Sequence, residues 1–122
     1  MPLHATAIGK ALLAHAPARV RTEVLGSPLT RRTPRTVVTP GLLRRQLATI
    51  RQTGVAYEYE ESRVGLACVA SPVLGDDGAV VAAVSVAGPT TRFDPRTHAA
   101  SVHAAATGIA LTLIRRANLM GG

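Results

Sequence analysis

The stretch Gly54–Pro89, GVAYEYEESRVGLACVASPVLGDDGAVVAAVSVAGP, decides the fold of this chain. Within it, residues 67–74 and 79–87 are two runs of small and branched apolar residues joined by the turn Gly75-Asp76-Asp77-Gly78. Apolar runs on either side of a Gly/Asp turn are typical of a β-hairpin. We therefore predict two antiparallel strands at the centre of the fold.

A third strand is predicted just before the hairpin, at residues 56–60. This segment alternates tyrosine with glutamate, and alternate side chains of a strand lie on opposite faces of the sheet. We expect Tyr57 and Tyr59 on one face, which can join the core, and Glu58 and Glu60 on the other, where they offer carboxylates.

Composition favours a single small domain. The chain has 122 residues, 47% of them hydrophobic but only 2% aromatic, so its core must be built from Ala, Val and Leu. The longest nearly uncharged apolar run, residues 79–87, is far shorter than the roughly 20 residues of a membrane helix, and no signal segment opens the chain. Because Cys68 is the single cysteine, an internal disulfide is excluded. We expect a cytoplasmic protein without a membrane segment.

The net charge of +7 is unevenly distributed, since residues 1–57 contain nine of the fourteen basic residues and only one acid. A basic surface is one feature of nucleic-acid-binding proteins. However, the chain has no aromatic residues interleaved with its arginines and no helix-turn-helix pattern. A solvated basic face is therefore the favoured interpretation, with direct nucleic-acid binding as the alternative.

Four helices are predicted from start and stop signals. The third begins at Thr39-Pro40, where threonine can cap and proline fits the first turn, and ends at Gly54. The fourth begins with the same device at Asp94-Pro95. The first two end before Pro17 and at Gly26. The predicted ranges are residues 6–16, 18–25, 40–53 and 95–118, with a connection at 29–38 that includes a short strand at 36–38.

Two of these helices carry apolar stripes. Leu43, Leu47 and Ile50 recur at helical spacing in the third helix. In the fourth helix the stripe consists of Val102, Ala106, Ile109 and Leu113. Helices around a central antiparallel hairpin indicate an α+β fold, a sheet flanked by helices.

Four segments together resemble the IclR family of bacterial transcription regulators, specifically its C-terminal effector-binding domain. They are residues 4–14 (HATAIGKALLA), 51–56 (RQTGVA), 60–73 (EESRVGLACVASPV) and 82–89 (AAVSVAGP). The resemblance implies a GAF-like, profilin-like fold with a pocket for a small-molecule effector, a carboxylate or an aromatic metabolite. It also implies homo-oligomers, a regulator that is not an enzyme, and no cofactor.

Family members also carry an N-terminal winged helix-turn-helix, and their effector domain begins with a helix and strands before the segment matching His4. We expect residues 1–122 to be a partial effector-binding domain that lacks its first strands, whether as a fragment, a mis-called gene start or a truncated gene product. DNA contact would then need a helix-turn-helix that this chain lacks. The strand at 79–87 should be left as an exposed edge.

The resemblance places the effector site on six residues of this sequence. Physics supports part of this independently, because the small residues that open the first helix would let an anion approach unpaired N–H groups. A helix start that simply packs on the sheet is the alternative, and an exposed strand position is the alternative for the acid. The six effector-binding residues are Ala7, Ile8, Glu58, Cys68, Ser85 and Ala87.

Two of these positions depart from the family pattern. Alanine at position 87 replaces the second of two serines, which removes one hydroxyl and favours a larger or less polar ligand over glyoxylate or pyruvate. Glu58 keeps the carboxylate of the family's acid but adds a methylene group. Both Ala87 and Glu58 are therefore expected to change how the site contacts its ligand.

Other chemistry is disfavoured. Cys68 lies in an apolar strand with no partner motif for a nucleophile, so a cysteine hydrolase is the weakest interpretation. His98 and His103 are five residues apart, on different helix faces, which argues against a metal pair. Gly9-Lys10 lacks the rest of a phosphate loop, and we expect Lys10 to be solvated. Glu60 and Glu61 are expected to form ion pairs with Arg63 and the basic first half.

An oligomerisation module without ligand sensing is the main competing function.

Overall fold

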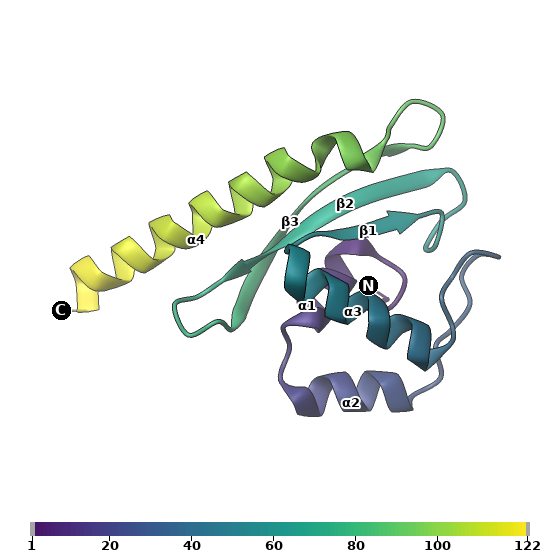
Figure 1. Ribbon diagram of the computed structural model, residues 1–122, viewed down its shortest axis with the longest axis horizontal. Helices are drawn as coiled ribbons and strands as arrows, with labels where there is room; N and C mark the ends of the chain where they lie inside the picture. The colour runs from purple at the N-terminus through teal and green to yellow at the C-terminus, as the bar shows by residue number, and fades with distance from the viewer. Residues whose placement is uncertain (1, 122) are drawn as a thin grey trace.

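Three antiparallel strands, in the order β1-β2-β3, form a sheet that carries helices on both faces in the computed structural model (Figure 1). Helices α1 and α3 lie on one face with α2 outside them, and α4 crosses the other face. This is the predicted α+β architecture. The structure describes residues 2–121, as α1 (Ala7–Ala14), α2 (Ala18–Gly26), α3 (Pro40–Thr53), β1 (Ala56–Tyr59), β2 (Leu66–Leu74), β3 (Val80–Pro89), a 3-10 turn η1 (Pro95–His98) and α4 (Ala99–Gly121).

The β2–β3 hairpin confirms the central prediction, with strand ends that shift by one or two residues. The ladder runs from the pair Leu66 and Pro89 to the pair Leu74 and Val80, with one irregularity next to the turn. In the turn, the φ of +81° at Gly78 is one that side-chain-bearing residues rarely adopt. In the part of the chain that the structure describes, β3 pairs only with β2. The expected exposed edge is therefore confirmed.

Strand β1 corrects the predicted assignment of faces. The two tyrosines do share a face, but it is the exposed one, with Tyr57 41% and Tyr59 44% accessible. Ala56 and Glu58 are buried instead, because α1 and α3 cover their side of the sheet, whereas α4 on the other side packs against β2 and β3. Glu60 was predicted to share the face of Glu58. It instead lies beyond the end of the strand, with a φ of +56°.

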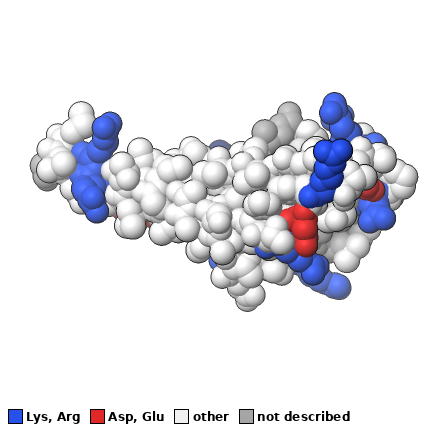
Figure 2. Space-filling model, turned by 90° about the horizontal axis from the view of Figure 1, so that it is seen from above, with Lys and Arg blue, Asp and Glu red and all other residues white. Residues whose placement is uncertain are grey.

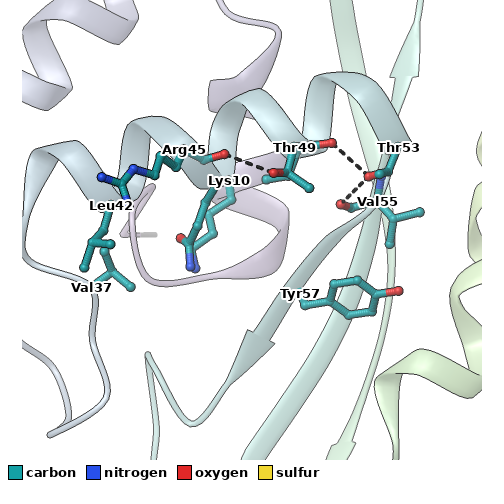
Figure 3. Close-up of a pocket in the computed structure, with 10 residues that line it drawn as sticks. Lys10, Val37, Leu42, Arg45, Thr49, Thr53, Val55 and Tyr57 are labelled. Carbon is teal, nitrogen blue, oxygen red and sulfur yellow. Dashed lines mark hydrogen bonds between the residues drawn. The ribbon is translucent and has the colours of Figure 1, made fainter.

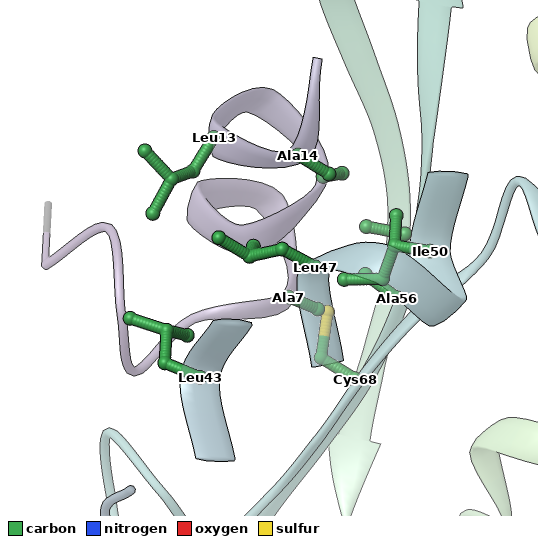
Figure 4. Close-up of a cluster of buried hydrophobic side chains, with 10 residues drawn as sticks. Ala7, Leu13, Ala14, Leu43, Leu47, Ile50, Ala56 and Cys68 are labelled. Atoms are coloured by element: carbon green, nitrogen blue, oxygen red, sulfur yellow. The ribbon is translucent and has the colours of Figure 1, made fainter. Parts of the chain in front are cut away.

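The core between α1, α3 and the sheet is built mainly from small side chains (Figure 4). Helix α1 contributes alanines and Leu13, and α3 contributes its predicted apolar stripe, which is buried as expected. Short side chains on both elements let the helices lie close to the strands. The cluster consists of Ala7, Ala11, Leu13, Ala14, Leu43, Leu47, Ile50, Ala56, Cys68 and Ala70.

Two features around α3 depart from the sequence-based prediction, one at its cap and one in the connection before it. Gly54 ends α3 in the left-handed conformation, at φ +77°. Thr39, however, makes no side-chain capping bond, and α3 is capped only by its backbone. The strand predicted at residues 36–38 is absent from this connection in the described chain, because the Thr36 hydroxyl instead donates to the Glu61 carbonyl oxygen at 2.6 Å and holds a turn.

Helix α4 is buried only over its first half. Asp94 caps the preceding turn η1 by accepting from the Arg96 N–H, as the sequence indicates. Val102 and Ala106 are each 2% exposed, but Ile109 and Leu113 of the same stripe are 43% and 46% exposed. The stripe prediction is therefore wrong for the second half, because the helix continues past the sheet (Figure 1).

The exposed part of α4 belongs to a largely uncharged surface. Figure 2 shows charged side chains at both ends of this face and few between them. The segment Pro95–Met120 is also long and apolar enough, with a mean hydropathy of 1.2, to pass a test for a membrane-spanning helix by length and composition. The expectation that residues 79–87 form the longest apolar run is therefore wrong. The packing of the first half on the sheet gives an alternative reason for this composition.

A buried ion pair joins α1 to the loop after β1. Lys10 is 1% exposed, and its Nζ lies 2.6 Å from Oε1 of Glu61. The expected solvated lysine is therefore wrong, because Lys10 lies on the face of α1 that packs against the fold. Pairing of the acids with the basic first half is confirmed by Glu61 with Lys10 and by Glu60 with Arg35, 3.5 Å apart. Burial raises the pKa of Glu61, and Lys10 offsets only part of this.

Breaking this pair from one side should be costly. We expect Lys10→Met to lower the free energy of unfolding by about 3–5 kcal/mol, because Glu61 is left buried without a cation. Lys10→Met combined with Glu61→Met should recover most of the loss, since both charges are then replaced by apolar groups. Urea unfolding of the three proteins measures the difference. A loss below about 1 kcal/mol in the single variant would contradict a buried pair of this kind.

Candidate functional site

The sheet residues of the predicted site form two adjacent rows across the face that α1 covers. In one row Glu58, Cys68 and Ala87 are neighbours on β1, β2 and β3. In the next row Ala56, Ala70 and Ser85 are neighbours in the same way. Because side chains two positions apart on a strand share a face, Ser85 and Ala87 lie together, as expected. Four predicted residues from three strands are thus brought into one area.

The start of α1 lies directly over these rows. Ala7 is fully buried, and its backbone N–H donates to Oε1 of Glu58 at 3.3 Å. The Thr6 hydroxyl caps the same helix end by accepting from the Gly9 N–H at 2.9 Å. A carboxylate at a helix N-terminus is stabilised by the unpaired N–H groups and the helix dipole. The position where the sequence predicts a ligand anion is therefore already taken by the protein's own Glu58.

Glu58 is held on its other oxygen by Ser62. The Ser62 N–H donates to Oε2 at 3.0 Å, and the Ser62 hydroxyl also bonds to that oxygen. With 2% of its surface exposed, Glu58 is not the exposed strand residue of the alternative interpretation. Sequence reasoning missed Ser62. Its position four residues after the acid, just beyond the strand end, is the only signal that could have found it.

Cys68 lies between Glu58 and Ser85. Burial and, to a lesser extent, the Glu58 carboxylate raise the pKa of its thiol to about 11, although a hydrogen bond with the Ser85 side chain opposes the rise. Its Sγ also lies 3.8 Å from the Val69 carbonyl oxygen. A thiol with such a pKa is almost wholly protonated at neutral pH, so it can donate a weak hydrogen bond but is a poor nucleophile.

The area opens toward solvent at the β3 edge. Ala87 is exposed, while Ile8 and Ser85 are half-buried. A cavity of about 470 Å³ lies elsewhere, between α3 and the opposite edge of the sheet, and its lining includes none of the six predicted residues. The predicted site is therefore a shallow, open face rather than an enclosed pocket.

Metal binding finds no support among residues 2–121, where no group of three or more His, Cys, Asp or Glu side chains is placed to hold an ion. His98 stacks on Phe93 with ring centroids 4.9 Å apart. The His103 ring lies against Gly54, so closely that a Cβ at that glycine would be 2.6 Å from Nε2. Both histidines are exposed side chains, and each packs against one neighbouring residue.

Comparison with known proteins places these features in a family. The family model described as bacterial transcriptional regulator IclR C-terminal matches residues 1–112. The HTH-type transcriptional repressor AllR of Klebsiella pneumoniae is 44% identical over 96 residues, which are 78% of this chain and 35% of the repressor. The chain thus spans about a third of the length of the curated relatives that it matches.

Two similar crystal structures contain ligands. An IclR homologue from Microbacterium hydrocarbonoxydans, complexed with 4-hydroxybenzoate, has a TM-score of 0.85 and 35% identity over 95% of this chain and 47% of its own. The inducer-binding domain of a double mutant of PobR from Acinetobacter, in complex with 3-hydroxybenzoic acid, has a TM-score of 0.80 and 30% identity over 93% of this chain and 66% of its own. These likenesses agree with the GAF-like fold expected from the sequence.

The protonated state of Cys68 is open to a direct test. We expect iodoacetamide to alkylate Cys68 in the folded chain at least about a hundredfold more slowly at pH 8 than in the urea-unfolded chain, because its pKa is raised from 9.0 to about 11 and the thiol is buried. The rate should keep rising up to about pH 11. Mass spectrometry of the alkylated fraction measures both rates. Folded and unfolded rates within tenfold of each other would contradict this description of the thiol.

Proposed function

Because the chain belongs to the IclR family of bacterial transcriptional regulators, we propose that it is the part of such a regulator that binds a small-molecule effector and thereby modulates DNA binding. The relatives are transcriptional repressors, which agrees with a role that is not enzymatic and with a cytoplasmic location. The observation that carries the proposal is the convergence of Glu58, Cys68 and Ser85 beneath the start of α1.

The ligand we propose is an aromatic hydroxy acid, entering from the open β3 edge. Since Glu58 already accepts from the Ala7 N–H at the start of α1, a ligand carboxylate is better accommodated at the far side of the area, next to the Ser85 hydroxyl. A ligand hydroxyl would then donate to Glu58, whose charge favours a donor and repels an acid. The methyl groups of Ala7 and Ala87, with Ile8, suit the flat apolar face of a ring.

The similar proteins support this choice of ligand class. Two of them are complexes with hydroxybenzoates, which carry a carboxylate and a hydroxyl on one ring. With alanine at position 87, this chain has a single hydroxyl on β3 at the site, so a smaller acid such as glyoxylate would have one contact fewer. The proposed effector-binding residues remain Ala7, Ile8, Glu58, Cys68, Ser85 and Ala87.

Thermal unfolding with a panel of acids tests the proposal. A hydroxybenzoate present at a hundred times its Kd should stabilise the chain by about 2.7 kcal/mol and raise Tm by roughly 10–20 °C. Ser85→Ala should weaken binding about tenfold or more through loss of a charge-assisted hydrogen bond. Ala87→Ser should strengthen binding of glyoxylate, whereas Ser101→Ala, an exposed position on α4, should change nothing. If no acid in the panel moves Tm, the proposed sensor function is wrong.

A second candidate function, oligomerisation, is favoured by one specific surface. Strand β3 has a free edge among the described residues, no charged side chain, and exposed Val81 and Val86. The apolar half of α4, with exposed Ile109, Leu111 and Leu113, extends beyond the sheet on the face that carries Val86. Free apolar strand edges pair with other chains. We propose that a second copy of this domain joins the sheet through β3.

A charge placed on that edge tests the pairing. We expect sedimentation velocity to show a dimer or larger assembly of the 122-residue chain, and Val86→Lys to yield monomers, because a lysine on an edge strand opposes pairing. Arg92→Lys, in the turn after β3, is a control that preserves charge. A monomeric wild-type chain at concentrations near 100 μM would exclude this second function.

A further inference from the structure

The cavity between α3 and the outer edge of β1 lies apart from the open face of the proposed effector site. It has a volume of about 470 Å³, within the roughly 300–1,000 Å³ typical of small-molecule sites. Its walls come from α3, the connection before α3, and β1, as Figure 3 shows. This cavity lies at the β1 edge of the sheet, whereas the proposed effector site opens at the β3 edge.

The walls of this cavity are mostly apolar. Val37, Leu42, Ile50 and Val55 supply aliphatic surface, and Tyr57 contributes its ring from β1. Tyr57 and Leu42 are large side chains that remain 41% and 48% exposed. An apolar hollow lined by exposed large side chains is stabilised when an apolar molecule displaces water from it.

One polar atom in the cavity lacks a partner. Oε1 of Gln46 is buried and has no hydrogen-bond partner among the described residues. Gln46 comes from α3 and is one of the residues that line the cavity. A buried acceptor without a donor costs free energy comparable to a lost hydrogen bond, so this site favours a ligand that brings an O–H or N–H group.

The edge of β1 offers too few free backbone groups for a peptide strand. Both the N–H and the carbonyl oxygen of Val55 bond to the Thr53 hydroxyl at 3.3 Å. At the other end, the strand stops at Tyr59, and Glu60 turns the chain with a φ of +56°. Only the backbone groups of Tyr57 and Tyr59, which alternate away from β2, remain for a further strand among the described residues. Strand addition needs several consecutive residues, so a single small molecule fits this edge better.

The charges around the cavity favour an uncharged ligand. Lys10 is the buried cation in its lining, and its charge is already neutralised by Glu61 at 2.6 Å. Arg45 also lines the cavity but is exposed to solvent, where an ion pair adds little. A carboxylate inside the cavity would therefore be desolvated without a dedicated partner.

We propose that this cavity is a second binding site, for a small uncharged ring compound that carries one hydroxyl or N–H donor. The ring packs against the aliphatic wall and Tyr57, and the donor bonds to Oε1 of Gln46. This site differs from the proposed effector site in place and in ligand charge, and it shares none of the six effector-binding residues.

Phenol serves as the probe, and toluene is the matched ring without a donor. Titrating phenol into the ¹⁵N-labelled 122-residue chain should give saturable NMR shifts at the Gln46 side-chain amide and the Tyr57 backbone amide. Toluene should bind at least about fivefold more weakly, because it leaves Gln46 without a donor. Gln46→Leu should weaken phenol binding by a similar factor, followed at Tyr57. Gln52→Leu, on an exposed position of the same helix that does not line the cavity, should not.

Filling the cavity from another position tests phenol binding without changing Gln46. Thr49 lines the cavity but is exposed, so Thr49→Phe fills the space without burying a new group and should abolish the shifts at Tyr57. Ser85→Ala should leave them unchanged, which separates this site from the effector site. Equal binding of phenol and toluene would overturn the proposal. Shifts confined to Cys68 and Ser85 would also overturn it. So would the absence of any saturable shift, because water alone would then satisfy Oε1 of Gln46.

Discussion

The close contact of α1 with the sheet is the constraint on which the rest of this structure depends. Small residues dominate the contact: Ala7, Ala11 and Ala14 on the helix belong to one buried cluster with Ala56, Cys68 and Ala70 on the strands. With 2% aromatic residues, the chain has few bulky side chains to hold these layers apart. A core of this kind gains its stability from tight packing, so one larger residue at the contact would separate the helix from the strands.

This closeness lets backbone and charged groups bond across the layers. Glu58 reaches the N–H of Ala7 from below, and Lys10 reaches Glu61 from above. The loop that follows β1 is thereby tied to α1 at two points only three residues apart. Neither acid would be tolerated at this depth without its partner, because an unpaired buried charge is strongly destabilising. The same bonds that secure the loop also leave Glu58 facing Cys68 and Ser85.

The two edges of the sheet consequently have different chemistry. The β3 edge combines the Ser85 hydroxyl with an uncharged apolar strand, which suits both an effector and a neighbouring chain. At the β1 edge, few backbone groups are free and an apolar cavity remains, which suits a small neutral molecule. A regulator that responds to a ligand needs a site linked to a packed element that can shift, and α1 contacts all three strands.

The sequence by itself determined the hairpin, the helix ends at Gly54 and Asp94, and the family, because turn residues, caps and motif spacing are local properties. It also predicted six site residues, four of which the sheet register places in two adjacent rows. Only the tertiary structure decided which face of β1 is buried, since alternation is the same whichever face the helices cover. Likewise, nothing local to Lys10 indicates that Glu61, 51 residues away, would neutralise it in the core. The half-exposed stripe of α4 has the same cause: helical spacing shows that an apolar face exists, but the length of the sheet determines how much of it is covered.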